Sequence, residues 1–84
     1  MDERVLVEVY VPAVQKRMEF FIPLHQQISL MKQVITIFLE EVWNLEEKSL
    51  FTLNWYAVEK QCYLKQELSL HENGIRSGET ILFI

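Results

Sequence analysis

The stretch Leu68-Ser69-Leu70-His71-Glu72-Asn73-Gly74-Ile75-Arg76-Ser77-Gly78, followed by Glu79-Thr80-Ile81-Leu82-Phe83-Ile84, decides how this chain folds. It holds the only two glycines among the 84 residues. Glycine adopts positive φ without the steric cost of a Cβ atom, so the chain can reverse direction twice within a few residues. The apolar residues that follow predict a strand over 80–84, with Ile81 and Phe83 inward and Leu82 and Ile84 outward.

Two alternating segments at the start of the chain predict a β-hairpin. Residues 5–11 carry valine at every odd position, which indicates a half-buried strand. Pro12 cannot donate to a sheet ladder and therefore ends this strand. After a short turn, residues 17–22 alternate again, with Met18, Phe20 and Ile22 inward. The side chains that this alternation places on the outer face are Leu6, Glu8, Tyr10, Arg17, Glu19 and Phe21.

Residues 28–43 predict one long helix, because they contain no Gly or Pro and carry apolar residues at helical spacing. Gln27 or Ser29 is expected to supply the N-cap. The row expected to face the core is Ile28, Met31, Ile35, Phe38, Leu39 and Val42. A second apolar row, which the loop 44–50 is long enough to cover, is Leu30, Val34 and Ile37. The narrow polar arc expected to be the wetter edge is Ser29, Lys32, Gln33, Thr36 and Glu40.

The remaining pattern completes a single α+β domain over residues 1–84. Segments 51–58 and 61–64 read as two further strands, and one of the adjacent Trp55 and Tyr56 should point outward. The order ββαβββ predicts a β-grasp, in which a mixed sheet packs on one helix with the first and last strands as parallel neighbours at its centre. A chain of 84 residues has room for one core and for no separate catalytic lobe.

Composition excludes several classes of partner. Half of the residues are apolar and the net charge is −4, with the eight basic residues scattered along the chain. Nucleic acid and anionic membranes both require clustered Lys and Arg, so neither is expected as a partner. No apolar run approaches the roughly 20 residues that span a bilayer, so no direct membrane insertion is expected. Cys62 is the only cysteine, which fits a reducing cytoplasm and a packed or idle thiol.

The sequence offers poor material for catalysis, and we expect no enzyme activity, cofactor or metal. His25 and His71 have no cysteine or carboxylate at metal-ligand or catalytic-triad spacing. The acidic residues Glu40-Glu41 and Glu46-Glu47 could attract a cation or a basic partner, but acids at a helix end are more often simply solvated. We therefore expect a solvated helix end there.

The hairpin, the helix and the closing segment 70–84 together resemble the ubiquitin fold, and within it the YukD/EsaB group of small bacterial ubiquitin-like proteins. The resemblance covers nearly the whole chain and lies in a leucine, an acidic residue, a Gly-Ile pair, a second glycine and a short aliphatic strand. It implies a cytoplasmic accessory or regulatory role in type VII (WXG100-substrate) secretion. The partner would then be a membrane or ATPase component of that machinery.

Ubiquitin itself ends in a basic extension closed by Gly-Gly, whereas this sequence ends at Ile84. We therefore expect non-covalent binding rather than conjugation through the C-terminus. Three alternatives stay open: a structural homodimer, a β-grasp adaptor unrelated to secretion, and, as the weakest, a sulfur-carrier or modifier protein.

The outer face of the predicted sheet is the candidate binding site, because ubiquitin-like domains commonly bind partners there. Several apolar side chains on one face can form a contiguous patch. The residues predicted to supply the contact are Leu6, Tyr10, Phe21, Leu82 and Ile84, with Glu8, Arg17 and Glu19 setting the register. The row Leu30, Val34 and Ile37 is the second candidate, and the sequence leaves the choice between the two surfaces open.

Overall fold

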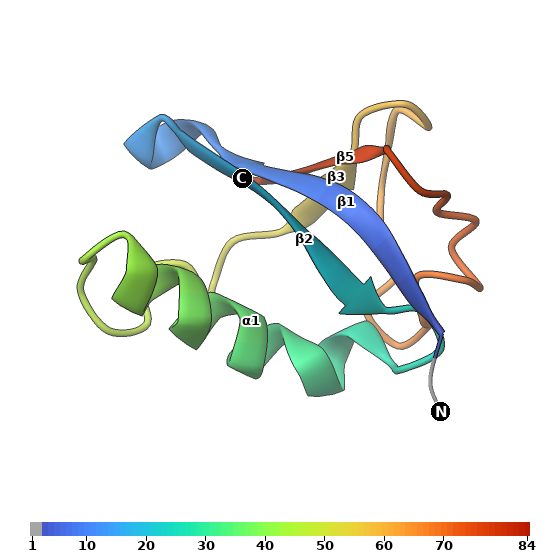
Figure 1. Cartoon of the computed structure of the whole chain (residues 1–84), viewed down its shortest axis with the longest axis horizontal. Coiled ribbons are helices and arrows are strands. Elements are labelled where there is room, and N and C mark those ends of the chain that lie inside the picture. The colour runs from blue at the N-terminus through green and yellow to red at the C-terminus, as the bar shows by residue number, and fades with distance from the viewer. Residues whose placement is uncertain (1–2) are drawn as a thin grey trace.

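The computed structural model describes residues 3–84, and within this range five strands form one sheet that packs on a single α-helix (Figure 1). The helix α1 crosses beneath the sheet, and the long hairpin lies above it (Figure 1). In chain order the elements are β1 (Arg4–Val11), a short 3-10 turn (Pro12–Val14), β2 (Lys16–Pro23), α1 (Ile28–Val42), β3 (Trp55–Ala57), β4 (Cys62–Tyr63) and β5 (Thr80–Phe83).

The order of the strands confirms the predicted β-grasp. Across the sheet it runs β2-β1-β5-β3-β4, and β1 pairs in parallel with β5 while the other three pairings are antiparallel. A parallel pair requires a long crossover connection, and α1 with the segments around it supplies that connection. The first and last strands are therefore central neighbours, as the sequence predicted.

The hydrophobic core lies between the sheet and α1, and the alternation of β1 supplies much of it. Val7, Val9 and Val11 are fully buried, as predicted from the odd-numbered valines. Trp55 is also fully buried, and its ring stacks on that of Phe83 with the centroids 4.7 Å apart. Trp55 thus faces inward, and its neighbour Tyr56 is the aromatic residue that faces outward.

The start of α1 is capped by a distant segment. Gln27 occupies the N-cap position, but its side chain makes no cap hydrogen bond and donates to the carbonyl of Glu67 at 2.7 Å instead. The backbone N–H groups of Ile28 and Ser29 donate to the carbonyls of Leu68 and Gln66. These donors have no partner inside a helix, so the 66–68 segment satisfies the groups that a side-chain cap would otherwise serve.

The orientation of α1 differs in part from the prediction: Ser29 and Gln33 of the expected polar edge are exposed, but the other three residues of that edge are not. Lys32, Thr36 and Glu40 are buried. The chain after the helix folds back over this edge, and both carboxylate oxygens of Glu40 accept backbone hydrogen bonds, from the N–H groups of Lys48 and Leu50 at 3.1 and 3.0 Å. Burial lowers the pKa of Lys32, whose ammonium donates to the side chain of Gln66.

The opposite side of α1 is exposed where an inward or covered face was expected. Phe38 and Val42, predicted to face the core, remain 46% and 48% exposed. Phe38 packs against Phe20 of β2, the edge strand, with the ring centroids 6.1 Å apart. The row Leu30, Val34 and Ile37 is also exposed, because the loop after α1 covers the polar edge instead of this row.

The later strands are shorter than predicted. Residues 51–52 form a turn, residues 53–54 have no regular structure, and β3 begins only at Trp55, because the hydrogen bond from the backbone N–H of Leu50 to Glu40 holds the preceding chain against the helix. Asn54 nevertheless exchanges two backbone hydrogen bonds with Ile84, one residue beyond β5. Gly74 and Gly78 have φ values of +79° and +90°, as their predicted role in two reversals requires.

A reciprocal pair of hydrogen bonds stabilises the turn over residues 69–72, which follows the 66–68 segment and precedes Gly74. The backbone N–H of Ser69 donates to the carboxylate of Glu72, and the backbone N–H of Glu72 donates to the hydroxyl of Ser69, both at 3.0 Å. This is the capping-box arrangement of a serine and a glutamate three residues apart. The turn leads directly into Ile75 and then to β5, so it helps to position the central strand.

Candidate protein-binding surface

The outer face of the sheet carries the side chains that the sequence predicted as a binding patch. Leu6, Tyr10 and Leu82 are half-buried, whereas Phe21 and Ile84 are 61% and 42% exposed. In β1, β2 and β5 they alternate with residues that face α1. Each therefore lies on the outward face, as expected from the period of two in a strand.

Strand register joins two of these residues into a row that crosses the whole sheet. Tyr10 lies opposite Arg17 on one side and Leu82 on the other. Leu82 in turn lies opposite Tyr56, which lies opposite Tyr63. Directly opposed residues on one sheet face have Cβ atoms about 4.5–5.5 Å apart, so such side chains touch. We call this set the cross-sheet row: Arg17, Tyr10, Leu82, Tyr56 and Tyr63.

Aromatic contacts stiffen both ends of the cross-sheet row. The guanidinium carbon of Arg17 lies 4.6 Å from the centre of the Tyr10 ring, within the range of a cation–π interaction. At the other end the rings of Tyr56 and Tyr63 meet edge to face with centroids 5.1 Å apart. Tyr63 remains 57% exposed on β4. The row therefore presents rigid aromatic surface with a positive charge at one end.

The strand register separates Leu6 and Phe21, which were predicted as part of the same patch, from the cross-sheet row. Leu6 and Phe21 lie opposite each other, but Glu8, Glu19 and Thr80 form a polar row between them and the cross-sheet row. The expected five-residue patch is thus divided into two apolar areas. Ile84 lies beyond Leu82 along the same strand direction, where its backbone pairs with that of Asn54.

The charged residues predicted to set the register of a partner interact with one another. Arg17 Nη1 lies 3.8 Å from Glu8 Oε1, and the hydroxyl of Thr80 donates to the same carboxylate oxygen at 3.4 Å. Glu8 and Glu19 are direct cross-strand partners, a like-charge pair that costs stability. Since the Arg17 side chain is well exposed, this ion pair adds little stability and leaves the guanidinium accessible.

Tyr63 was missed by the sequence analysis, and Tyr56 was identified only as one of two options. The signal for Tyr63 was present, since the inward Leu64 next to it requires Tyr63 to face outward in any strand. Its place beside Tyr56 depends on the pairing of β3 with β4, which the sequence pattern did not supply.

The two histidines considered for chemistry lie together at the surface. The rings of His25 and His71 lie 4.8 Å apart on the surface, and His25 Nε2 lies 3.1 Å from Glu3 Oε1. Within residues 3–84, no group of three His, Cys, Asp or Glu side chains is placed to hold a metal ion. Cys62 is exposed on β4, so it is not packed, and of the two expected states the idle thiol stays a prediction. The expected solvated helix end is wrong for Glu40, which is buried and hydrogen-bonded.

Comparison with known proteins assigns the fold. No family model matches the sequence, and no curated protein matches it. Among solved structures, the ubiquitin-like domain of the Mycobacterium tuberculosis type VII secretion system protein EccD1 superposes with a TM-score of 0.72 at 16% identity over 98% of each chain. A ubiquitin-like domain from Arabidopsis thaliana gives a TM-score of 0.71 at 19% identity, over 98% of this chain and 77% of that chain.

A third similar structure is part of a larger assembly. It is a chain of the MycP5-free ESX-5 inner membrane complex, with a TM-score of 0.69 at 15% identity. The match covers 96% of this chain and 21% of that one. In the part of the present chain that the structure describes, no helix has the length and apolar character needed to cross a membrane. The chain thus has the ubiquitin-like β-grasp fold, and its structural neighbours include domains of type VII secretion components.

Proposed function

We propose that this ubiquitin-like domain is a non-enzymatic protein-interaction module that docks non-covalently through the cross-sheet row. The observation that carries the proposal is the continuity of that row across all five strands, from Arg17 through Leu82 to Tyr63. Interface centres are enriched in tyrosine and arginine, and a rigid aromatic surface loses little conformational entropy on binding. The paired strands also hold these side chains in place, so docking requires no rearrangement of the backbone.

We further propose that the partner is a membrane or ATPase component of a type VII secretion system, and that the chain acts in the cytoplasm as an accessory or regulatory subunit. The resemblance of segment 70–84 to the YukD/EsaB group supports this role. The fold similarity to the EccD1 domain and to a chain of the ESX-5 complex is consistent with it. Fold alone is a weak guide to function, so the role depends on a direct binding test.

The experiment is affinity capture from cytosol and detergent-solubilised membranes of the source cell, with the wild-type chain and Leu82→Asp compared by mass spectrometry. The wild type should retain a type VII ATPase or membrane component, and Leu82→Asp should lose it, because a charge at the centre of an apolar row is desolvated on docking. Tyr63→Ala tests the same row at an exposed position that leaves the core intact.

A matched control places the same charge elsewhere. Val34→Asp adds an aspartate to the exposed side of α1, at a residue that is 69% exposed. This variant should capture the secretion component as the wild type does. Capture of only further copies of this chain, lost in Leu82→Asp, would replace the secretion role with a homodimer. Undiminished capture by both Leu82→Asp and Tyr63→Ala would show that the cross-sheet row is not the docking surface.

A further inference from the structure

The exposed side of α1 carries a second apolar surface that the proposed function does not use. Leu30 and Val34 are 71% and 69% exposed, and Ile37 is 45% exposed. They are spaced i, i+4 and i+7, so they lie along one side of the helix over about two turns. Glu41 is the next residue in this series. The surface is therefore an aliphatic row that ends in a carboxylate, and we call it the helix row: Leu30, Val34, Ile37 and Glu41.

A groove lies beside the C-terminal half of the helix row. Two hollows adjoin there, with volumes of about 500 Å³ and about 240 Å³. Ile37, Glu40 and Lys48 line both of them, so the hollows form one continuous groove between α1 and the loop that follows it. Phe51, which is 43% exposed, extends the apolar lining at one end, and Leu45 extends it at the other.

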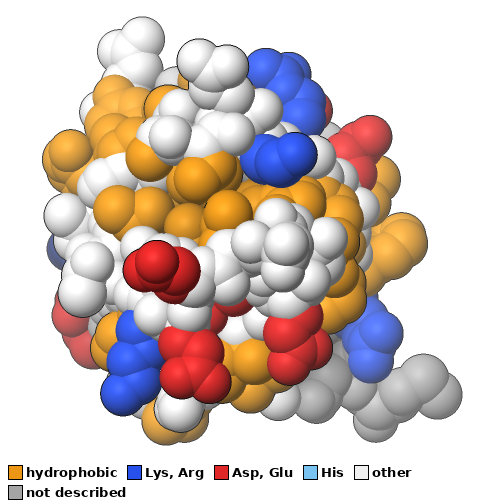
Figure 2. Space-filling view, turned by 90° about the vertical axis from the view of Figure 1, so that its left-hand side faces the viewer, with side chains coloured by type: hydrophobic (Ala, Val, Ile, Leu, Met, Phe, Trp, Pro, Cys, Tyr) orange, Lys and Arg blue, Asp and Glu red, His pale blue; other side chains and the backbone are white. Residues whose placement is uncertain are grey.

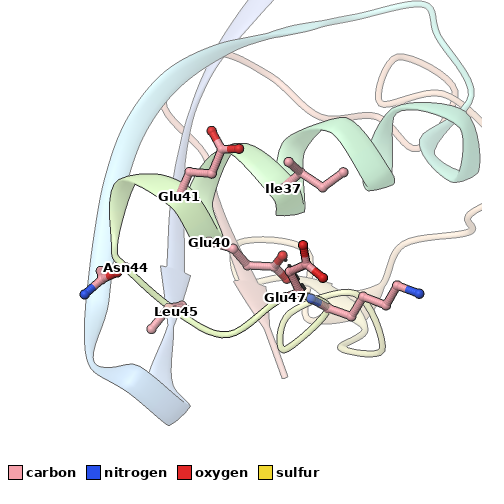
Figure 3. Close-up of a pocket in the computed structure, with 7 residues that line it drawn as sticks. Ile37, Glu40, Glu41, Asn44, Leu45 and Glu47 are labelled. Atoms are coloured by element: carbon pink, nitrogen blue, oxygen red, sulfur yellow. Dashed lines mark hydrogen bonds between the residues drawn. The ribbon is translucent and has the colours of Figure 1, made fainter.

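The groove is acidic at the end where the helix row stops. In Figure 3, Glu40 and Glu41 project from α1, and Glu47 extends from the loop toward Glu40. Glu40 is already engaged by the backbone of the loop. Among residues 3–84, no hydrogen bond or ion pair engages the carboxylates of Glu41 and Glu47. Three carboxylates and the single ammonium of Lys48 line the larger hollow, which leaves it negatively charged.

Apolar and acidic areas adjoin on the surface at this end of the molecule. Figure 2 shows the end that holds the C-terminus of α1 and the tip of the hairpin, where acidic side chains gather in the lower half next to exposed apolar surface. A ligand that covers apolar surface at this end and also offers a cation would match both areas. Exposed apolar surface with a polar rim is the usual composition of a protein-binding site.

The geometry favours a helical ligand over an extended one. An extended peptide gains affinity by pairing with a free sheet edge, and α1 offers no such edge because its backbone groups bond within the helix. A second helix can pack its own side chains between those of Leu30, Val34 and Ile37, as helices do in ridge-and-groove packing. The spacing of the helix row therefore selects an amphipathic helix with apolar residues at matching intervals.

We propose that the helix row and its groove bind an amphipathic helix of a partner protein that carries a Lys or Arg next to its apolar stripe. The apolar stripe covers Leu30, Val34 and Ile37. The basic side chain enters the groove that Glu41 and Glu47 line, where it compensates two carboxylates that no hydrogen bond or ion pair within residues 3–84 engages. This surface is separate from the cross-sheet row, so the inference holds or fails independently of the role in secretion.

The test is selection of helical peptides from a phage-display library with randomised surface positions, using the purified wild-type chain as the target. Each selected peptide is then measured against Val34→Asp and Tyr63→Asp by fluorescence anisotropy. We expect a class of peptides that loses at least tenfold in affinity with Val34→Asp and less than twofold with Tyr63→Asp. In this class, Lys or Arg should be enriched next to the apolar stripe.

A charge exchange tests the basic contact directly. In the Val34-dependent peptides, replacing the enriched Lys or Arg with Glu should weaken binding to the wild type, and the double variant Glu41→Lys/Glu47→Lys should restore it. Val34→Ala keeps the helix and serves as a milder probe of the same position. Recovery of no Val34-dependent peptide, or of such peptides without a preference for Lys or Arg, would overturn the proposal.

Discussion

The cross-sheet row and the helix row are both exposed, yet they differ in how their side chains are supported and charged. In the cross-sheet row, each side chain contacts a neighbour on the next strand, and Tyr10 and Leu82 are half-buried as a result. In the helix row, most of the surface of Leu30 and Val34 is exposed to solvent. Arg17 ends the first row and Glu41 ends the second.

This difference indicates two kinds of partner. A supported aromatic row with a cation suits a preformed, acidic surface, whereas an exposed aliphatic row with a carboxylate suits a basic helix. The two rows lie on opposite sides of the core, so one chain can contact both partners at once.

Removing the support behind the cross-sheet row should cost the most stability. Trp55 lies in the core directly beside the outward Tyr56, and Trp55→Ala should lower the free energy of unfolding by about 3–5 kcal/mol through loss of apolar burial and a residual cavity. Chemical denaturation followed by circular dichroism measures this loss.

The matched control is Trp55→Phe. It keeps an aromatic ring against Phe83 and removes an indole N–H that is buried and has no acceptor in the structure described. Its cost should be much smaller than that of the alanine variant. Equal losses for the two variants would show that the indole N–H, and not the ring volume, stabilises this part of the core.

Substitution of Glu40 should cause the second largest loss of stability. It should change the groove beside α1 and leave the outer sheet face as it is. Glu40→Ala leaves the buried N–H of Leu50 and the N–H of Lys48 without acceptors, which should lower the free energy of unfolding by about 1–3 kcal/mol. The groove beside the helix row should open while the cross-sheet row keeps its affinity. Thermal denaturation gives the stability, and Glu41→Ala, at an exposed position, should change it by less than about 0.5 kcal/mol.

Reversing one charge in each row should cause a smaller loss of binding affinity, confined to the row that carries the charge. Arg17→Glu should weaken binding at the cross-sheet row, and Glu41→Lys should weaken binding at the helix row, each by up to about fivefold because exposed ion pairs contribute little. Titration calorimetry at two salt concentrations measures both effects, which should shrink at high salt. If either reversal weakens both rows equally, the charges act through the net charge of the chain and not locally.

Acidification should weaken the turn that positions β5, and this should be the smallest of the expected losses of stability. The backbone N–H of Ser69 is the main cause that holds the pKa of Glu72 below its ordinary value of 4.5. A lowered carboxyl pKa in the folded state stabilises the protein above the pKa of the unfolded chain and ceases to do so as the pH falls through the folded value. Unfolding curves between pH 7 and about pH 3 should show this loss in the wild type, and Glu72→Gln should lack this component of the pH dependence.

The sequence predicted the hairpin better than the helix for a physical reason. In β1, a period of two leaves only two faces, and the valines identify one of them. In α1, apolar residues occur on nearly all sides, so the spacing of Ile28 and Met31 does not decide whether Phe38 is buried. The loop that returns over Lys32 and Glu40 decides which side of the helix is covered. It is held by hydrogen bonds from backbone N–H groups to the buried carboxylate of Glu40, eight and ten positions earlier in the chain.

The candidate site was predictable residue by residue but not as a surface. Alternation alone placed Leu6, Phe21 and Leu82 on the outer face. Whether they touch depends on the parallel register of β1 with β5, which sets Tyr10 opposite Leu82 and leaves Leu6 two positions behind Glu8. No local pattern encodes that register, because it follows from the length and packing of the crossover.

The most direct test of the cross-sheet row is a map of amide chemical shifts in the ¹⁵N-labelled chain during titration with a captured type VII component. Docking through this row should give the largest changes at Tyr10, Tyr56, Tyr63 and Leu82, and these changes should disappear with Leu82→Asp. Changes confined to α1 and the loop after it, with none on the outer sheet face, would contradict it.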